Sequence, residues 1–183
     1  MINILIILGT SRKKNYSQYV AKFIHKQATS FDGIRSSFLN NASFKFNLSD
    51  EADGSKYPKL TAQIAKADGF VLVVPEYHHG YPATIKFILD LNLKEYSHKP
   101  VAVVGVSAYK YGGARMIENL LPVLRELKLI TSFSDLNVFR VQKEIQNGKF
   151  VDLEFWQKKT QRMLGELKWM AQVFKDKRKK LDL

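Results

Sequence analysis

The sequence predicts an α/β fold in which a doubly wound, five-stranded parallel sheet lies between two layers of helices. Three short segments, residues 2–8, 70–74 and 101–106, are apolar throughout, and amphipathic helical patterns separate them. Strands that are apolar on both faces are typical of parallel sheets that helices cover on both sides. Because strands and helices alternate along the chain, we expect right-handed crossovers and a three-layer α/β/α arrangement.

The individual elements follow from hydrophobic periodicity and from the residues that interrupt it. A polar stretch after the second strand indicates a long loop, and Pro122 is expected to bend or weaken its helix because it lacks a backbone donor. Pro82 suits the first turn of a helix. In chain order, we predict a strand over 2–8, a helix over 17–28, a weaker strand over 34–40, a helix over 58–67, a strand over 70–74, a helix from about Pro82, a strand over 101–106, a helix over 113–128, a last strand within 130–139 and a long amphipathic helix over 152–174.

Five strands fit the flavodoxin-like order 2-1-3-4-5, and a nucleotide-binding sheet with the order 3-2-1-4-5 is the competing topology. A chain of 183 residues with 45% hydrophobic residues can bury a sizeable core. We therefore predict a single domain over 1–183. Within it, the basic, amphipathic helix of residues 152–183 packs on the rest or extends from it.

Composition excludes several classes of protein. The chain has no cysteine, which excludes disulfides, thiolate nucleophiles and cysteine-ligated metals. It has no run of about 18 apolar residues, so no transmembrane helix is expected. The apolar N-terminal segment lacks both the basic stretch and the small-residue cleavage site of a secretory signal. The last two observations predict a cytoplasmic protein without membrane insertion.

The charge is strongly positive, with 29 Lys and Arg against 17 Asp and Glu, a net charge of +12. Such an excess attracts nucleotides, nucleic acids and acidic surfaces. Part of it lies in residues 175–180, where five basic residues accompany one acid. This segment is interpreted either as a solvated, frayed helix end or as a contact for a polyanion.

Three polar loops follow the three most apolar strands, at residues 9–17, 75–82 and 107–115. Ligands of doubly wound sheets bind beyond the carboxyl ends of the strands. If the three strands are neighbours, the loops meet at one edge of the sheet. Their glycines and polar side chains then form a single site.

The first of these loops resembles a phosphate-binding turn. Gly9 permits a tight turn, the following helix directs free N–H groups at the loop, and Arg12 adds a charge-assisted contact. The loop contains neither G-x-x-x-x-G-K-[ST] nor G-x-G-x-x-G, which argues against an NTP-hydrolysing P-loop and weakens a dinucleotide fold. A polar helix cap is the alternative. Side-chain hydrogen bonds are available from Thr10, Ser11, Asn15 and Ser17.

The second loop could offer backbone N–H and C=O groups to a planar heterocycle, with Tyr77 and Tyr81 as aromatic surface. Glu76 is either a general acid or base or, more simply, part of a structural ion pair. His78 and His79 do not indicate a metal site. Adjacent histidines in a turn commonly point apart, and no carboxylate at ligand spacing completes a set.

The third loop contains Gly112 and Gly113, which allow a backbone to approach a ligand closely. A plain helix-entry turn is the alternative interpretation. Ser107 and Tyr109 lie within plausible reach of the same ligand, whereas Tyr111 could pack at a subunit contact.

Together, these motifs resemble the NADPH-dependent FMN reductase family, which has flavodoxin-like folds and contains quinone, azo-dye and metal-ion reductases. The resemblance covers residues 2 to about 130, and the section after residue 140 matches no part of the pattern. The chain has Thr10 where the family has Ser, His78 where it has Asn, and Phe87 where it often has Asn. The matching residues are Gly9-Thr10-Ser11-Arg12 with Ser17, Pro75-Glu76-Tyr77-His78-His79-Gly80-Tyr81-Pro82 with Lys86 and Asp90, and Gly112-Gly113-Ala114-Arg115.

The resemblance implies an FMN-dependent NAD(P)H oxidoreductase, in which a hydride passes from NAD(P)H to FMN N5 and then to a quinone, azo compound, flavin or metal-ion acceptor. No catalytic side chain and no metal are implied, because the flavin performs the difficult step. By position, the resemblance implies that the FMN phosphate is bound by Thr10, Arg12, Ser17 and Gln18, with Ser11 in the same loop. It implies that the ring is lined by Pro75, Glu76, Tyr77 and His78. The other edge of the ring would be closed by Ser107, Gly112 and Gly113.

The resemblance also implies a homodimer or homotetramer, with Glu76, Tyr81 and Arg115 near a subunit interface. Two other functions fit the same fold. One is a binding module whose basic surface contacts an acidic partner or nucleic acid, although no nucleic-acid-binding motif is present. The other is an electron carrier of the flavodoxin type. The positive charge favours NADPH over NADH as the co-substrate.

Overall fold

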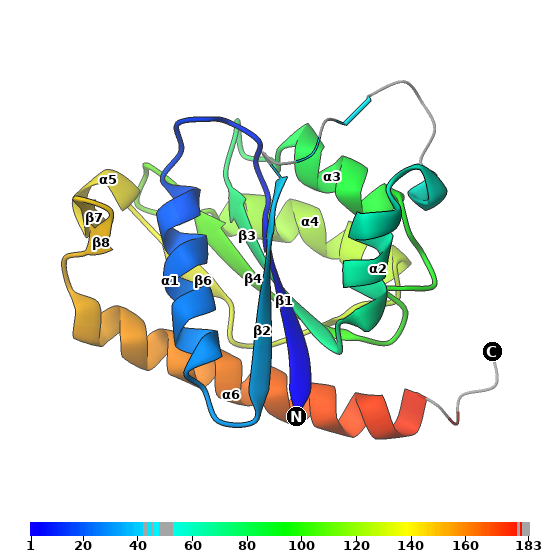
Figure 1. Ribbon diagram of the computed structural model, residues 1–183. Helices are drawn as coiled ribbons and strands as arrows, with labels where there is room; N and C mark the ends of the chain where they lie inside the picture. Colours follow the sequence, from blue (N-terminus) through cyan, green and yellow to red (C-terminus); the bar gives the residue numbers. More distant parts are fainter. Residues whose placement is uncertain (42–43, 45, 48–52, 179, 181–183) are drawn as a thin grey trace.

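The computed structural model describes residues 1–41, 44, 46–47, 53–178 and 180 (Figure 1). Its centre is a parallel sheet with the strand order β2-β1-β3-β4-β5, and β6 also pairs with β4. This order confirms the predicted 2-1-3-4-5 topology and excludes 3-2-1-4-5. The strands are β1 (Ile2–Leu8), β2 (Ile34–Asn40), β3 (Gly69–Pro75), β4 (Pro100–Val106), β5 (Ile130–Thr131) and β6 (Leu136–Val138).

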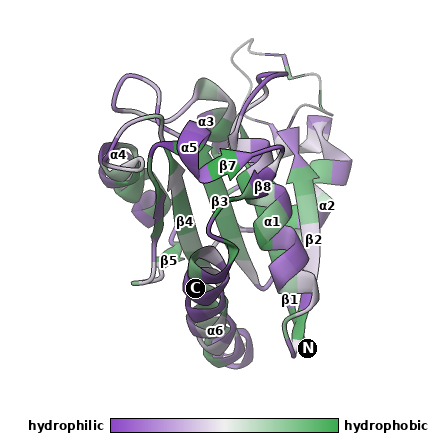
Figure 2. Ribbon diagram, turned by 90° about the vertical axis from the view of Figure 1, so that its left-hand side faces the viewer, coloured by the Kyte–Doolittle hydropathy of each residue, from purple (hydrophilic) through white to green (hydrophobic). Residues whose placement is uncertain are grey.

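Helices cover both faces of the sheet, as the alternating pattern predicts (Figures 1 and 2). The helices α1 and α6 pack on one face, and α2, α3 and α4 pack on the other. The helices are α1 (Ser17–Thr29), α2 (Pro58–Lys66), α3 (Ala83–Asp90), α4 (Ala114–Glu126) and α6 (Leu153–Arg178). Shorter elements are a 3-10 turn (Gly54–Lys56), α5 (Val141–Glu144) and the hairpin β7 (Ile145–Gln146) and β8 (Lys149–Phe150).

The continuous apolar strands are explained by two hydrophobic cores, one on each side of the sheet. In β1, Ile4 and Ile6 face the core beneath α1 and α6, while Leu5 and Ile7 face the core beneath α2, α3 and α4. All four side chains are fully buried. Each contributes roughly 1.5–3 kcal/mol relative to an exposed position. A polar residue on either face of these central strands would therefore be destabilising.

The predicted last strand within 130–139 is divided into β5 and β6, which pair with the two ends of β4. Between them, the side chain of Asp135 replaces a backbone acceptor, since Val103 N donates to Asp135 Oδ1 at 3.1 Å. Pro82 also differs from the prediction, because it precedes α3 rather than lying in its first turn. Residues 141–150, for which no element was predicted, form α5 and the β7–β8 hairpin.

The helix α6 extends to Arg178, four residues beyond its predicted end. Its last turn is held by the buried carboxylate of Asp68, which lies 2.8 Å from Lys175 Nζ and 3.8 Å from Arg178 Nη2. Asn3 N also donates to Asp68. Up to Arg178, the basic C-terminal segment is therefore an anchored helix and not a frayed end.

Within the described ranges, every helix is too short or too polar to cross a membrane.

Lys99, at the start of β4, is an unusual buried cation. It is 5% exposed, and its Nζ donates at 3.0 Å to the carbonyl oxygens of both Ile64 and Ala65. These carbonyls belong to the last turn of α2, where a positive charge is favoured by the helix dipole. Burial, together with the positive charge of Arg178, nevertheless lowers the pKa of Lys99 from 10.5 to about 8.

Replacing Lys99 by Met is expected to remove a pH dependence of stability. The folded chain releases the Lys99 proton near pH 8, whereas the unfolded chain keeps it until about pH 10.5. Since the unfolded state binds more protons in this window, the free energy of unfolding contributed by Lys99 rises with pH. Denaturant titrations between pH 7.5 and 9.5 should show the wild type gaining stability relative to Lys99→Met. A constant difference would contradict the lowered pKa.

Candidate functional site

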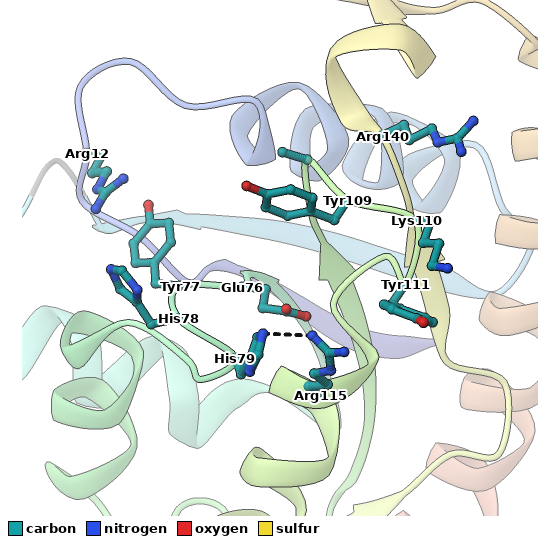
Figure 3. Close-up of a pocket in the computed structure, with 11 residues that line it drawn as sticks. Arg12, Glu76, Tyr77, His78, His79, Tyr109, Lys110, Tyr111, Arg115 and Arg140 are labelled. Carbon is teal, nitrogen blue, oxygen red and sulfur yellow. Dashed lines mark hydrogen bonds between the residues drawn. The ribbon is translucent and has the colours of Figure 1, made fainter.

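A cavity of about 800 Å³ lies beyond the carboxyl ends of the central strands, between the three polar loops (Figure 3). The loops after β1, β3 and β4 all contribute to it, and a fourth segment, after β6, completes it. The loops therefore converge as their positions after neighbouring strands predict. The cavity is lined by Arg12, Glu76, Tyr77, His78, His79, Ala108, Tyr109, Lys110, Tyr111, Arg115 and Arg140.

The loop after β3 forms a two-residue turn at the cavity rim. Tyr77 and Gly80 exchange two backbone hydrogen bonds of 2.9 Å each, so that His78 and His79 occupy the turn. Both histidines have positive φ angles, 48° and 67°. A left-handed conformation is unfavourable for residues other than Gly or Asn. The turn is consequently strained, and it presents both imidazoles at the rim.

The loop after β1 is attached to the loop after β3. Gly9 N donates to Val73 O at 2.8 Å, so the chain passes too close to β3 for a larger residue. Thr10 Oγ1 is 3.0 Å from the hydroxyl of Tyr77. The guanidinium of Arg12 lies 3.8 Å from the centre of the Tyr77 ring. This cation–π contact holds Arg12 without neutralising its charge.

Four of the residues predicted to contact a cofactor line the cavity: Arg12, Glu76, Tyr77 and His78. The others are not part of its lining. Ser11 contacts Thr84 through its hydroxyl at 3.2 Å, and Gln18 is bonded to Asn15 through both its backbone and its amide. Buried behind the cavity wall are Thr10, Ser17, Pro75 and Ser107.

The two glycines of the third loop have a packing role. Gly112 and Gly113 have φ angles of 58° and 85°. A Cβ atom on Gly113 would lie 2.8 Å from Gly105 Cα, and one on Gly105 would lie 2.5 Å from Gly112 O. A Cβ atom on Gly112 would lie 2.7 Å from Asn137 C in β6, so the close approach that these glycines permit is between the loop and the strands β4 and β6. Neither glycine lines the cavity.

Sequence reasoning missed Lys110 and Arg140 and gave His79 no role. Lys110 lies in the third loop, between Tyr109 and Tyr111. Only the polar composition of that loop indicated a ligand there. Arg140 follows β6, outside every motif, and its backbone N donates to Tyr109 O at 3.1 Å. No sequence signal would have placed Arg140 at the cavity, because that contact depends on the tertiary structure.

The cavity is strongly cationic. Arg12, Lys110, Arg115 and Arg140 line it, and none of them forms an ion pair within the part of the chain that the structure describes. Arg12, Tyr77 and His78 lie at one end, and Lys110, Tyr111 and Arg140 lie at the other (Figure 3). This arrangement favours a ligand with negative charge at both ends.

Neutral groups hold two of these cations in position. Arg115 donates to His79 Nε2 at 2.7 Å and lies 4.9 Å from the centre of the Tyr111 ring. Lys110 lies 5.0 Å from the same ring.

The carboxylate of Glu76 also lines the cavity, and its Oε2 is buried without a hydrogen-bond partner among the described residues. A buried acceptor of this kind requires a donor from a ligand or from water.

Comparison with known proteins identifies relatives for most of the chain. The model of the NADPH-dependent FMN reductase family matches residues 2–140. The chain is 31% identical over 121 residues to an NADPH azoreductase of Bacillus sp. (strain OY1-2), covering 65% of this chain and 66% of that protein. It is 30% identical over 139 residues to an NAD(P)H-dependent FMN reductase of Schizosaccharomyces pombe, covering 69% and 67%. The matches thus span about two thirds of these relatives.

Solved structures with the same fold cover nearly the whole chain. The flavoenzyme NAD(P)H:(acceptor) oxidoreductase of Paracoccus denitrificans superposes with a TM-score of 0.76 at 20% identity, covering 95% of this chain and 99% of that one. A flavodoxin, WrbA-like protein of Agrobacterium tumefaciens superposes with a TM-score of 0.61 at 12% identity, covering 95% and 99%. These likenesses confirm the flavodoxin-like fold.

Replacing His78 by Asn is expected to stabilise the free protein. Asn tolerates the left-handed conformation better than His, so the change should raise the free energy of unfolding by roughly 0.5–1 kcal/mol. Denaturant titration of the chain without ligand measures this difference. His25→Asn, at a helical position in α1, is the control and should bring no gain. A loss of stability in His78→Asn would show that the turn is not strained.

Proposed function

Because the chain belongs to the NADPH-dependent FMN reductase family, we propose that it binds FMN in the 800 Å³ cavity and uses it to oxidise NAD(P)H and reduce a small acceptor. The acceptor belongs to the quinone, azo, flavin or metal-ion class. The cationic cavity at the carboxyl ends of β1, β3 and β4 is the observation that carries this proposal. It lies where ligands of doubly wound sheets bind.

The residues around the cavity fit FMN. Its volume is in the range of cofactor sites, about 300–1,000 Å³. Arg12 can bind a phosphate monoester, and the unpartnered Glu76 Oε2 can accept a hydrogen bond from a ring N–H. Among the described residues, the backbone N–H groups of Ala108, Lys110 and Tyr111 donate no hydrogen bond, so they remain available for ring carbonyls.

The protein's own contribution is binding and orientation. When bound, FMN supplies the two-electron chemistry that the side chains lack. Tyr77 fixes Arg12 at the phosphate end, and the loop backbone directs donors at the polar edge of the ring. Tyr109, whose side chain is 76% exposed, lies between the two ends of the cavity and borders the space left for a nicotinamide or an acceptor (Figure 3).

The second cationic end of the cavity supports a preference for NADPH. With Arg12 assigned to the FMN phosphate, Lys110 and Arg140 remain for a second anionic group. NADPH differs from NADH by a 2′-phosphate, which carries two negative charges near neutral pH. We assign Lys110 and Arg140 to this phosphate, because both are cations without a carboxylate partner in the described part of the chain.

Replacing Arg12 by Ala should weaken FMN binding by about 1–3 kcal/mol, or roughly 5- to 150-fold in affinity, because a charge-assisted contact is lost. Quenching of FMN fluorescence measures the dissociation constant, and the wild type should bind one FMN per chain. Lys13→Ala, one residue further along the same loop and outside the cavity lining, is the matched control. Unchanged affinity in Arg12→Ala would remove Arg12 from the phosphate site, and a wild type that rejects FMN would refute the function.

Replacing Lys110 and Arg140 by Ala should raise the KM for NADPH about tenfold and leave the KM for NADH nearly unchanged, because only NADPH carries the 2′-phosphate. Steady-state assays of the FMN-loaded protein with both nucleotides measure this. Lys94→Ala, an exposed lysine outside the cavity lining, is the control. Equal increases for both nucleotides would assign the two cations to a group that NADH and NADPH share.

A further inference from the structure

The outward face of α6 carries apolar side chains that the fold does not use. Phe155, Trp169 and Val173 are 40%, 64% and 42% exposed. They share one helical face with Lys159 and Arg162, because these positions are separated by three, four or seven residues, and Glu166 lies on the same face between Arg162 and Trp169. The side chains that α6 packs against the sheet, such as Trp156 and Leu164, lie on its other side and are buried. Trp169 and Val173, four residues apart, are neighbours on this face, and contiguous exposed apolar patches mark interaction sites.

The loop between β5 and β6 extends this face. Phe133 in that loop is 89% exposed, and its backbone N donates to Glu166 Oε1 at 2.8 Å. The hydroxyl of Ser134 donates to the other oxygen of the same carboxylate. These two bonds tie the loop to α6. They keep Phe133 at the surface beside the helix.

A groove of about 540 Å³ lies between the loop and the first turns of α6. Phe133 and Phe155 supply apolar walls, and Lys158, Lys159 and Arg162 supply positive charge. We call these five residues, together with Trp169 and Val173, the α6 face. From Phe155 to Val173 it extends about 27 Å along the helix, at 1.5 Å per residue.

The cations of the α6 face differ from the other cations of α6. Lys168 pairs with Asp32, and Lys175 and Arg178 pair with Asp68. Lys158 and Lys159, in contrast, have no carboxylate partner within the described residues, and Lys159 lies 5.1 Å from the ring centre of Phe155. The positive charge of Lys158 and Lys159 is therefore available to another molecule, whereas Arg162 lies close enough to Glu166 to lower the pKa of that carboxyl.

From these observations we propose that the α6 face docks an acidic segment of another protein that carries apolar anchor residues. Aromatic and Arg side chains are enriched at protein interfaces, where a polar rim surrounds them. Acidic residues of the partner pair with Lys158, Lys159 and Arg162, and an apolar side chain enters the groove beside Phe133. This interaction is independent of the cofactor cavity.

Two other occupants fit the charges less well. A second copy of this chain would bring the same three cations against one another, and like charges across an interface oppose association. A nucleic acid would pair its phosphates with the same cations, but it has no apolar side chain to enter the groove beside Phe133. It would also leave Trp169 and Val173 without an apolar partner further along the helix.

The α6 face is separate from the proposed cofactor site. In Figure 1, α6 crosses the molecule toward the amino ends of the strands, and the loops that form the cavity lie at the carboxyl ends. No residue is shared between the linings of the groove and the cavity. Partner binding and NAD(P)H oxidation can therefore be measured independently.

Fluorescence anisotropy of the full chain with a labelled synthetic peptide tests the proposal. The probe alternates Glu with Leu and Phe, and we expect saturable binding with a Kd of about 10 µM at moderate salt. The double variant Lys158→Glu/Lys159→Glu should weaken binding at least about tenfold, and Phe133→Ser should weaken it without a change in charge. Turnover of NAD(P)H by both variants should match the wild type.

The matched control is Lys59→Glu/Lys94→Glu, which makes the same charge change at exposed lysines outside the α6 face and should bind the peptide like the wild type. An equal loss of peptide binding in this control would show that the interaction depends only on net charge, and it would overturn the proposal. The absence of saturable peptide binding would also overturn the proposal. Two further results would do the same: tighter binding of labelled oligouridine that Lys158→Glu/Lys159→Glu abolishes, and self-association in sedimentation that Phe133→Ser abolishes.

Discussion

The burial of β1, β3 and β4 on both faces is the constraint on which the rest of the structure depends. All three strands have neighbours on both edges: β3 lies between β1 and β4, β2 pairs with the other edge of β1, and β5 and β6 pair with the other edge of β4. The loops that leave these strands are then attached to the adjacent strand: Gly9 N donates to Val73 O, Glu76 N to Val106 O and Ser107 N to Val138 O, at 2.8–2.9 Å. Each loop therefore begins at a position fixed by the sheet, and the cavity between the loops is a consequence of the core.

The same attachment explains how the cavity keeps its positive charge. A cation held by a carboxylate would be neutralised, but Arg12 is held by the face of Tyr77 and Arg115 by the neutral Nε2 of His79. Both partners come from the loop after β3, whose two-residue turn is strained at His78 and His79. Backbone strain of this kind persists where the surrounding structure fixes it, and it is found disproportionately at binding sites. We interpret the strained turn as the means by which one loop positions both cations and leaves their charge for an anionic ligand.

How much the sequence could predict depends on whether a feature is local. The apolar run of β1 and the alternation of strands and helices predict the sheet, because burial on two faces requires this pattern. The position of Arg12 at the cavity follows from the loop that carries it. The burial of Thr10 and Ser17 does not, because it depends on which elements of the fold pack over the loop. Likewise, Gly112 and Gly113 indicate a close approach without indicating that β4 is the partner, and Arg140 reaches the cavity only through the path of β6.

The positive charge of the chain has a different role at each end of the sheet. At the amino end, the buried carboxylate of Asp68 pairs with Lys175 and Arg178, so this part of the excess stabilises the last turn of α6. At the carboxyl end, the cavity gathers cations without acids. Between these two sets, Lys158 and Lys159 point outward from a helix whose other side is committed to the core, beside aromatic residues that no other part of the described chain covers. Since α6 can bury only one side against the sheet, its basic and aromatic outer side requires a separate explanation, and an acidic partner accounts for both the charge and the rings.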